Sequence, residues 1–183
     1  MILASASPRR RELLGLLGLD FEVVPSDAEE LTEGEPAEVV VENALRKARA
    51  VAASVPDALV LGADTDVAID DRLLGKAASE DEARSHLRTL SGRAHDVLGG
   101  VALVCEGGEV SEVVRTTVTF RELNAAEVDA YVASREWEDR AGAYAVQGLG
   151  ASLVAGVDGD LSNVIGLPIP TLSRMIASLQ DRK

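Results

Sequence analysis

The sequence predicts an α/β protein that forms one domain with two lobes. Apolar, strand-like runs alternate with capped, helix-like segments along the chain, which is typical of this fold class. The chain has 183 residues, 46% of them hydrophobic and 27% charged, so it can bury a core of its own without disulfides or metal. No internal repeat, low-complexity segment or linker interrupts it. We therefore expect a single domain over residues 1–183.

The N-terminal segment predicts a short strand over residues 1–4, followed by a helix. Ser7 fits the N-cap, Pro8 the first helical position, and Gly18 ends the helix. Arginines occupy residues 9–11 of the first turn, where the helix dipole disfavours cations. An anionic ligand reverses that argument, because free backbone N–H groups and guanidinium groups both bind phosphate. The alternative is a solvated arginine face.

Residues 21–25 predict a second strand, which leads into an acidic loop over residues 26–30. Glu29 and Glu30 of this loop could ligate a hard cation such as magnesium; a solvated loop is the alternative. The next helix is expected over residues 37–53, and its spacing puts Lys47 on or beside the apolar stripe. Lys47 then either extends its ammonium group to water or faces a phosphate.

Asp64 is the candidate working carboxylate. The apolar run Ala58–Leu61 before Gly62 predicts a buried strand. A charge placed directly after such a run is expected at the end of the strand, where a cleft can open. The alternative is that residues 62–66 form a turn stabilised by Asp side chains.

A hairpin is predicted over residues 67–74, and Gly75–Lys76 follows it directly. This dipeptide is not part of a P-loop, because the upstream glycine spacing and a Ser or Thr after the lysine are both absent. Lys76 could still reach an anion held near Asp64.

The rest of the chain predicts three helices and three strands. These are a helix from Ser79 to about residue 91, antiparallel strands over residues 93–120 with a turn at 107–108, a helix from the Asn124 cap to about Ser134, a strand over residues 151–157, a turn at 158–160, an extended stretch over 163–168 and a last helix over about 170–179. Residues 136–150 lack periodicity and form either a connector or a loop close to a ligand.

The composition disfavours several classes of function. A net charge of −13, from 31 acidic and 18 basic residues, disfavours binding to a nucleic acid polymer or an anionic membrane. With two histidines and no Gly-x-Ser-x-Gly motif, neither a Ser-His-Asp hydrolase nor a Cys/His zinc site is expected. The single Cys105 fits a reducing compartment and no apolar run has the length of a membrane span, so we expect a soluble cytoplasmic protein. The excess of acidic residues over lysines suggests, as a hypothesis, a salt-rich cytoplasm.

A set of short motifs runs in order along almost the whole chain. The motifs are Leu3–Arg10 with Glu12–Leu14, Lys47–Ala48, Gly62–Thr65, Gly75–Lys76, Ser91–Arg93 with His95 and Val97, Asp139 with Ala141–Tyr144 and Gln147–Gly148, and Asn163–Pro168. Together they resemble the Maf family of nucleoside triphosphate pyrophosphatases. The resemblance implies an elongated fold with a central mixed β-sheet flanked by helices. It also implies hydrolysis of a nucleoside triphosphate to the monophosphate and pyrophosphate, a divalent cation (Mg²⁺ or Mn²⁺) as cofactor, and a homodimer.

The resemblance also implies roles for individual residues. Asp64 would be the general base that activates the attacking water, and Glu29 or Glu30 would join it as metal ligands. The residues implied to bind the substrate are Ser7, Arg9, Arg10, Lys47, Thr65, Lys76 and Gln147. A few positions depart from the family pattern: Asp66 stands where an apolar residue is common and adds negative charge near the proposed metal, and Arg140 replaces a usual lysine.

The resemblance also implies that Arg9, Thr65 and Gln147 set the base preference, because they match the subgroup acting on dTTP and UTP. A glutamine amide offers a donor and an acceptor to the O4 and N3–H edge of uracil or thymine, and cytosine reverses that edge. Modified relatives such as 5-methyl-UTP fit the same argument. Two alternatives remain at this point: the same reaction on 7-methyl-GTP, and a nucleotide-binding regulator of cell division and septum formation.

Overall fold

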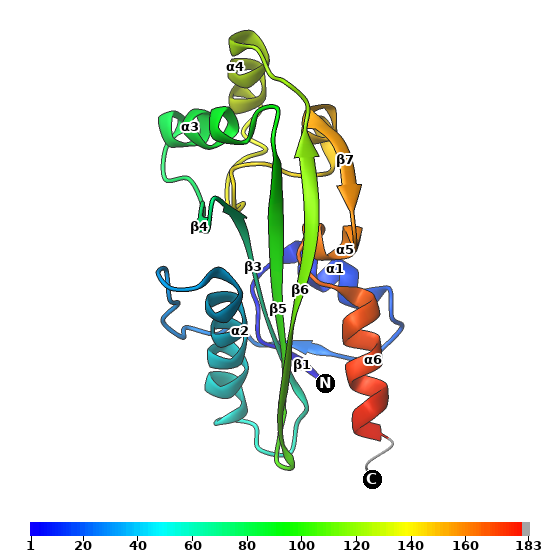
Figure 1. Cartoon of the computed structure of the whole chain (residues 1–183). Coiled ribbons are helices and arrows are strands. Elements are labelled where there is room, and N and C mark those ends of the chain that lie inside the picture. Colours follow the sequence, from blue (N-terminus) through cyan, green and yellow to red (C-terminus); the bar gives the residue numbers. More distant parts are fainter. Residues whose placement is uncertain (181–183) are drawn as a thin grey trace.

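The computed structural model describes residues 1–180 and shows an elongated mixed β-sheet flanked by helices (Figure 1). The strands are β1 (Ile2–Leu3), β2 (Glu22–Val23), β3 (Val60–Ile69), β4 (Arg72–Leu73), β5 (Ala94–Cys105), β6 (Gly108–Phe120) and β7 (Val154–Asp158). The helices are α1 (Pro8–Gly15), α2 (Pro36–Ala52), α3 (Glu80–Leu90), α4 (Ala125–Ala133), the 3₁₀ helix η1 (Gly148–Leu153), α5 (Leu161–Ile165) and α6 (Ile169–Gln180). None of the helices within residues 1–180 combines the length and the hydrophobicity needed to cross a bilayer.

The sheet has the strand order β2-β1-β3-β5-β6-β7, and β4 pairs with β3 outside this path. Strand β1 runs parallel to both β2 and β3, whereas every other pair is antiparallel. The sheet is therefore mixed, and the predicted fold class is confirmed.

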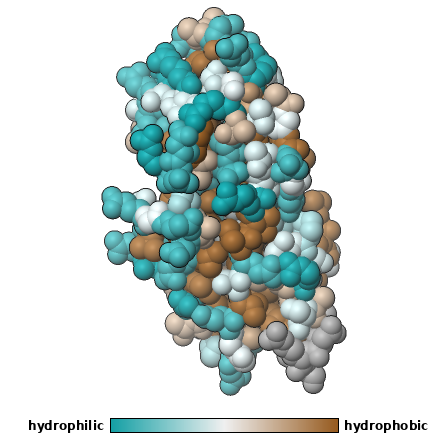
Figure 2. All heavy atoms as spheres, in the orientation of Figure 1, coloured by the Kyte–Doolittle hydropathy of each residue, from teal (hydrophilic) through white to brown (hydrophobic). Residues whose placement is uncertain are grey.

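The long hairpin of β5 and β6 runs through the length of the molecule (Figure 1). At one end it packs with α3 and α4 around a cluster that includes Leu87, Phe120 and Val132. At the other end α2 covers one face of the sheet, and α1 and α6 cover the other. In the same orientation, hydrophilic residues dominate the surface over α3 and α4, and hydrophobic ones show between α2 and α6 (Figure 2). The apolar side chains thus form separate cores at the two ends of one continuous sheet.

Helix α2 lies unusually close to the sheet because glycines stand beneath it. A Cβ atom added to Gly62 of β3 would lie 2.0 Å from the carbonyl oxygen of Ala44, and one added to Gly100 of β5 would lie 2.0 Å from that of Val40. Only a residue without a side chain permits this approach. The close contact brings the side chains of α2 alongside β3.

Strand β3 has a gap in its pairing on one edge. Its residues Val60 and Leu61 pair with β1, and Ala68 and Ile69 pair with β4. Between them, residues 62–67 have a strand neighbour only on the β5 side within the described chain. Asp64 lies within this stretch, so the expectation that it stands at the end of a strand is wrong. The cleft opens beside the strand because the neighbouring strands stop short.

Two further predictions near the C-terminus are wrong in part. The strand predicted over residues 151–157 begins only at Val154, because η1 precedes it; the carboxylate of Glu136 accepts hydrogen bonds from the first N–H groups of that helical segment. The extended stretch predicted over residues 163–168 contains α5, which starts at Leu161. Asp160 caps this helix by accepting a hydrogen bond from the N–H of Ser162.

Replacing Gly100 with alanine is expected to lower the free energy of unfolding by at least about 1–3 kcal/mol, because the new methyl group would overlap the α2 backbone. Gly156 is the matched control: it lies in β7 and an added Cβ would meet nothing within 4 Å. Urea unfolding of Gly100→Ala and Gly156→Ala checks this. Equal stability of the two variants would contradict the close packing of α2.

Candidate active site

A cleft crosses the middle of the molecule at the pairing gap of β3. It consists of two adjoining cavities of about 680 Å³ and 350 Å³. The residues that line both are Arg10, Glu30, Lys47, Thr65, Lys76 and Ala141. Ser7, Arg9 and Gln147 line the larger cavity, and Asp64 lines the smaller one. The cleft therefore brings together every site residue expected from the sequence except Glu29.

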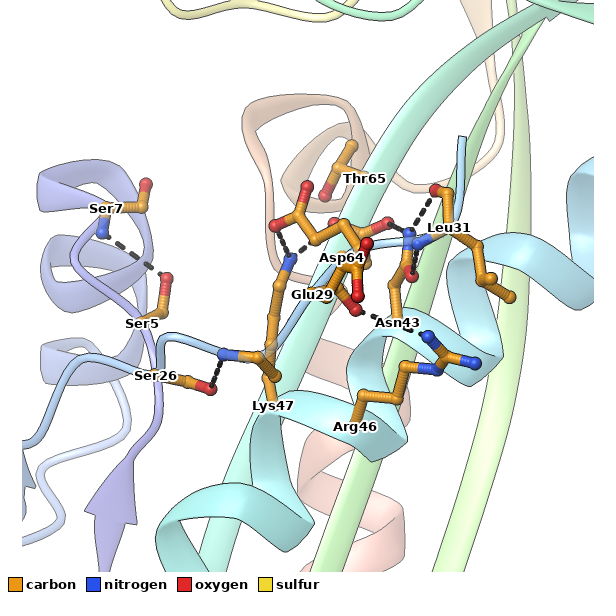
Figure 3. Close-up of polar contacts among 12 residues, drawn as sticks. Ser5, Ser7, Ser26, Glu29, Leu31, Asn43, Arg46, Lys47, Asp64 and Thr65 are labelled. Carbon is orange, nitrogen blue, oxygen red and sulfur yellow. Dashed lines mark hydrogen bonds and ion pairs between the residues drawn. The ribbon is translucent and has the colours of Figure 1, made fainter. Parts of the chain in front are cut away.

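The centre of the site is a pair of ionic contacts made by one buried lysine (Figure 3). Lys47 Nζ lies 2.7 Å from Asp64 Oδ1 and 2.6 Å from Glu30 Oε1. The Lys47 residue is 8% exposed, so its ammonium group does not extend to open water. The expectation of an ammonium group extended to water is therefore wrong, and the alternative, a lysine that faces a phosphate, stays a prediction.

The acidic loop presents Glu30, not Glu29, to the site. The Glu30 carboxylate pairs with Lys47. For Glu29, the contact to α2 is made by the backbone carbonyl oxygen, which accepts a hydrogen bond of 3.3 Å from Arg46 Nη1 (Figure 3). Of the two glutamates, Glu30 is thus the one that faces the cleft, and its role as a metal ligand stays a prediction.

Arg10 crosses from the first turn of α1 to β3. Its Nε donates to the carbonyl oxygen of Gly166 at 3.0 Å, its Nη1 to Ser5 Oγ at 3.1 Å and its Nη2 to Thr65 Oγ1 at 3.3 Å. Burial lowers the pKa of Arg10, and the negative charges of Asp64 and Glu30 partly offset this. Ser5 had not been expected in the site; it also accepts a hydrogen bond from the Ser7 N–H.

Arg9 and Gln147 line the larger of the two cavities. Arg9 Nη2 donates to the carbonyl oxygen of Asp139 at 3.1 Å, which ties α1 to the segment over residues 138–147. Burial, together with the positive charges of Arg140 and Arg10, lowers the pKa of Arg9. Gln147 is exposed at the N-terminus of η1. The segment that lacked periodicity is therefore a wall of the cleft and not a plain connector.

Asp66 holds the loop that carries Lys76. Its Oδ1 accepts hydrogen bonds from the N–H groups of Val67 at 2.7 Å and Gly75 at 3.0 Å. Burial raises the pKa of Asp66 to about 6, and the charge of Asp64 adds to the increase. Lys76 itself is exposed at the rim of both cavities. The Asp66 side chain thus anchors the turn before Lys76 by accepting two hydrogen bonds from backbone N–H groups.

The carboxylates of the site are too few to hold a metal ion alone, but they could bind one together with the phosphates of a substrate. Within residues 1–180 there is no group of three or more His, Cys, Asp or Glu side chains placed to hold a metal ion. Asp64 and Glu30 nevertheless converge on the Lys47 ammonium group, so two carboxylates already share one positive charge. One or two carboxylates plus substrate phosphates are the usual ligands of Mg²⁺ in phosphate chemistry.

The fold and the cleft define an α/β protein that carries a cluster of arginine and lysine side chains around one strand carboxylate. The chain belongs to the Maf family: the family model described as "Maf-like protein" matches residues 1–179. The resemblance read from the sequence motifs is thereby confirmed.

Relatives of the chain cover nearly its full length. A protein of Deinococcus radiodurans named dTTP/UTP pyrophosphatase is 50% identical over 177 residues, which are 96% of this chain and 91% of that protein. A protein of the same name from Bacillus cereus is 48% identical over 176 residues, 95% of this chain and 92% of the relative. The crystal structure of a nucleoside-triphosphatase (dITP/XTP pyrophosphatase) from Mycobacterium abscessus shares the fold, with a TM-score of 0.52, 18% identity and coverage of 97% and 96% of the two chains.

The raised pKa of Asp66 predicts a specific pH dependence of stability. The unfolded carboxyl loses its proton near pH 4 and the folded one only near pH 6, so this group makes the fold less stable as pH rises through that window. At about 1.4 kcal/mol per pH unit, the loss attributable to Asp66 reaches roughly 3 kcal/mol.

Asp66→Asn keeps an oxygen that accepts the two backbone hydrogen bonds but cannot ionise. The variant should therefore gain stability relative to the unmodified protein between pH 4 and pH 7, as measured by urea unfolding at each pH. A difference between the two proteins that stays constant with pH would contradict the burial of this carboxylate.

Proposed function

We propose that this protein hydrolyses nucleoside triphosphates to the monophosphate and pyrophosphate, with dTTP and UTP as preferred substrates. The observation that carries the proposal is the placement of Arg10, Lys47 and Lys76 around Asp64 in one cleft. Relatives named dTTP/UTP pyrophosphatase at about half identity support the same reaction.

The reaction needs a positioned water molecule, a base to accept its proton and positive charge around the phosphates. A water molecule attacks the α-phosphorus atom, Asp64 accepts its proton, the bond from the α-phosphorus to the bridging oxygen breaks, and pyrophosphate leaves. Positive groups held around the phosphates stabilise the charge that develops in the transition state. Lys47 and Asn43 each donate to one oxygen of Asp64, which orients the carboxylate and leaves lone pairs for the water.

Asp64 and Glu30 would hold a divalent cation together with the substrate phosphates. When bound, such a cation polarises the phosphoryl oxygens and neutralises part of their charge. Lys47, which pairs with both carboxylates in this structure, is then free to turn toward a phosphate oxygen. The Gly75–Lys76 turn, fixed by Asp66, places a second ammonium group at the rim of the same cavity.

The larger cavity is the proposed site for the base and the sugar. Gln147 at its wall carries an amide that matches the O4 and N3–H edge of uracil or thymine. Arg9 and Thr65 line the cavity from the opposite elements α1 and β3. A single nucleotide and not a polymer is the proposed ligand, in keeping with the net charge of −13.

Asp64→Asn should lower kcat for pyrophosphate release by about 10²–10⁴-fold, because the amide cannot accept the proton from water. The assay measures pyrophosphate from each common NTP and dNTP with Mg²⁺ or Mn²⁺, at low and at molar salt. Calorimetry with a nucleotide analogue that carries an imido group between the α- and β-phosphates should show that the variant still binds.

Asp70→Asn is the matched control, since Asp70 lies on the exposed β3–β4 turn and pairs with Arg93 away from the cleft. It should keep full activity. Absence of pyrophosphate from every nucleotide with the unmodified protein would overturn the proposed reaction, and unchanged turnover in Asp64→Asn would overturn the role of Asp64.

Gln147→Glu should reduce the preference for UTP over CTP by roughly 10-fold or more, since a carboxylate cannot donate to O4 of uracil. The measurement is the ratio of kcat/KM for the two nucleotides in both proteins. An unchanged ratio would show that another residue selects the base.

A further inference from the structure

Asn43 is a buried polar residue on the side of α2 that packs against the sheet. It is 3% exposed and lies four residues before Lys47, so both side chains leave the same face of the helix. Buried amides need partners for all their polar groups. The partners of Asn43 are Leu31, at the end of the acidic loop, and Asp64 (Figure 3).

The three hydrogen bonds of Asn43 fix its orientation. Its Oδ1 accepts from the N–H of Leu31 at 2.7 Å, and its Nδ2 donates to the carbonyl oxygen of Leu31 at 3.0 Å and to Asp64 Oδ2 at 3.1 Å. Turning the amide over would set N–H against N–H at Leu31 and oxygen against the Asp64 carboxylate. The amide therefore has one acceptable orientation, in which a donor points at Asp64.

The position of Asn43 joins two parts of the site that come from separate segments. Leu31 follows Glu30 directly, so holding the Leu31 backbone at both its N–H and its carbonyl group sets where the Glu30 side chain starts. The same amide holds the Asp64 oxygen that Lys47 does not contact. One side chain thus ties the acidic loop and the strand carboxylate to a single point on α2.

No other common side chain of this size makes the same set of contacts. Aspartate would bring a second negative charge against Asp64 and could not donate to the Leu31 carbonyl oxygen. Leucine would fill the space but leave the Leu31 backbone groups and one Asp64 oxygen without this partner. The amide is required for its mixed donor and acceptor character.

We propose that Asn43 is a positioning residue that sets the separation and orientation of the Asp64 and Glu30 carboxylates. This inference rests on the proposed function, in which those two groups hold a divalent cation and Asp64 activates water. Asn43 lines the smaller cavity, and in this proposal it acts through the two carboxylates. Its loss should weaken cation binding and slow turnover, while the binding of the nucleotide by the arginines and Lys76 changes little.

Asn43→Leu and Arg46→Met form a matched pair of variants. Asn43→Leu removes two hydrogen bonds from α2 to Leu31 and one to Asp64, whereas Arg46→Met removes one hydrogen bond from α2 to the Glu29 carbonyl oxygen. Mn²⁺ binding to the protein saturated with the imido nucleotide analogue is measured by electron paramagnetic resonance, and kcat and KM for dTTP are measured separately. Asn43→Ser, which shortens the side chain and keeps it polar, serves if Asn43→Leu does not fold.

The expected result is a loss of roughly 10–100-fold in Mn²⁺ affinity and in kcat for the Asn43 variant, the range found when groups that orient metal ligands are removed. At saturating Mn²⁺, its KM for dTTP should stay within about threefold, and Arg46→Met should change all three quantities by less than about threefold. Equal effects of the two variants, or no measurable Mn²⁺ binding by the unmodified protein in the presence of the analogue, would overturn the role of Asn43. Failure of the unmodified protein to release pyrophosphate would overturn the proposed function instead, and the Mn²⁺ comparison would still decide the position of Asn43.

Discussion

The site depends on the buried ion pair between Lys47 and Asp64. An ammonium group removed from water is costly unless an opposite charge compensates it, and here the compensating carboxylate comes from the neighbouring strand at 2.7 Å. The contact of Lys47 with Glu30 is weaker in energy despite its length of 2.6 Å, because the Glu30 side chain is 51% exposed and water screens it. The Lys47–Asp64 pair is therefore the stronger of the two contacts, and it links α2 to β3.

The glycines and the short strands of the sheet make the space in which Lys47 and Asp64 meet. Glycines at positions 62 and 100 let α2 approach until its backbone touches the strands, which places Asn43 and Lys47 level with Asp64. Strands β1 and β4 cover the two ends of β3 and leave its middle without a neighbour on that edge. A strand with a continuous partner there would have closed the cleft. The site thus requires small residues beneath α2 and short strands beside β3, although these features add little to the hydrophobic core.

Much of the arrangement could be predicted from local patterns, and the rest depends on contacts between distant segments. The Ser7 cap, the Asn124 capping box and the β5–β6 hairpin follow from neighbouring residues, and the structure contains all three. The helix that starts at Leu161 and the late start of β7 depend on hydrogen bonds to Asp160 and to the distant Glu136, so periodicity alone missed them. In the site, the spacing of Asn43 and Lys47 could have indicated a shared face. The partners of the Asn43 amide could not be inferred, because they come from a loop and a strand that the fold brings together.

The charges of the cleft are nearly balanced although the whole chain carries −13. Five cations line its two cavities, namely Arg9, Arg10, Lys47, Lys76 and Arg140, and so do five carboxylates, namely Glu30, Asp64, Asp66, Glu138 and Asp139. A triphosphate that entered would draw Lys47 toward its own oxygens and leave Asp64 and Glu30 facing each other without the ammonium charge between them. A divalent cation bound by these two carboxylates restores that charge, so the proposed binding of cation and of nucleotide should each favour the other. In the proposed reaction, the ammonium group of Lys47 would hold the two carboxylates together until the substrate and its cation replace it.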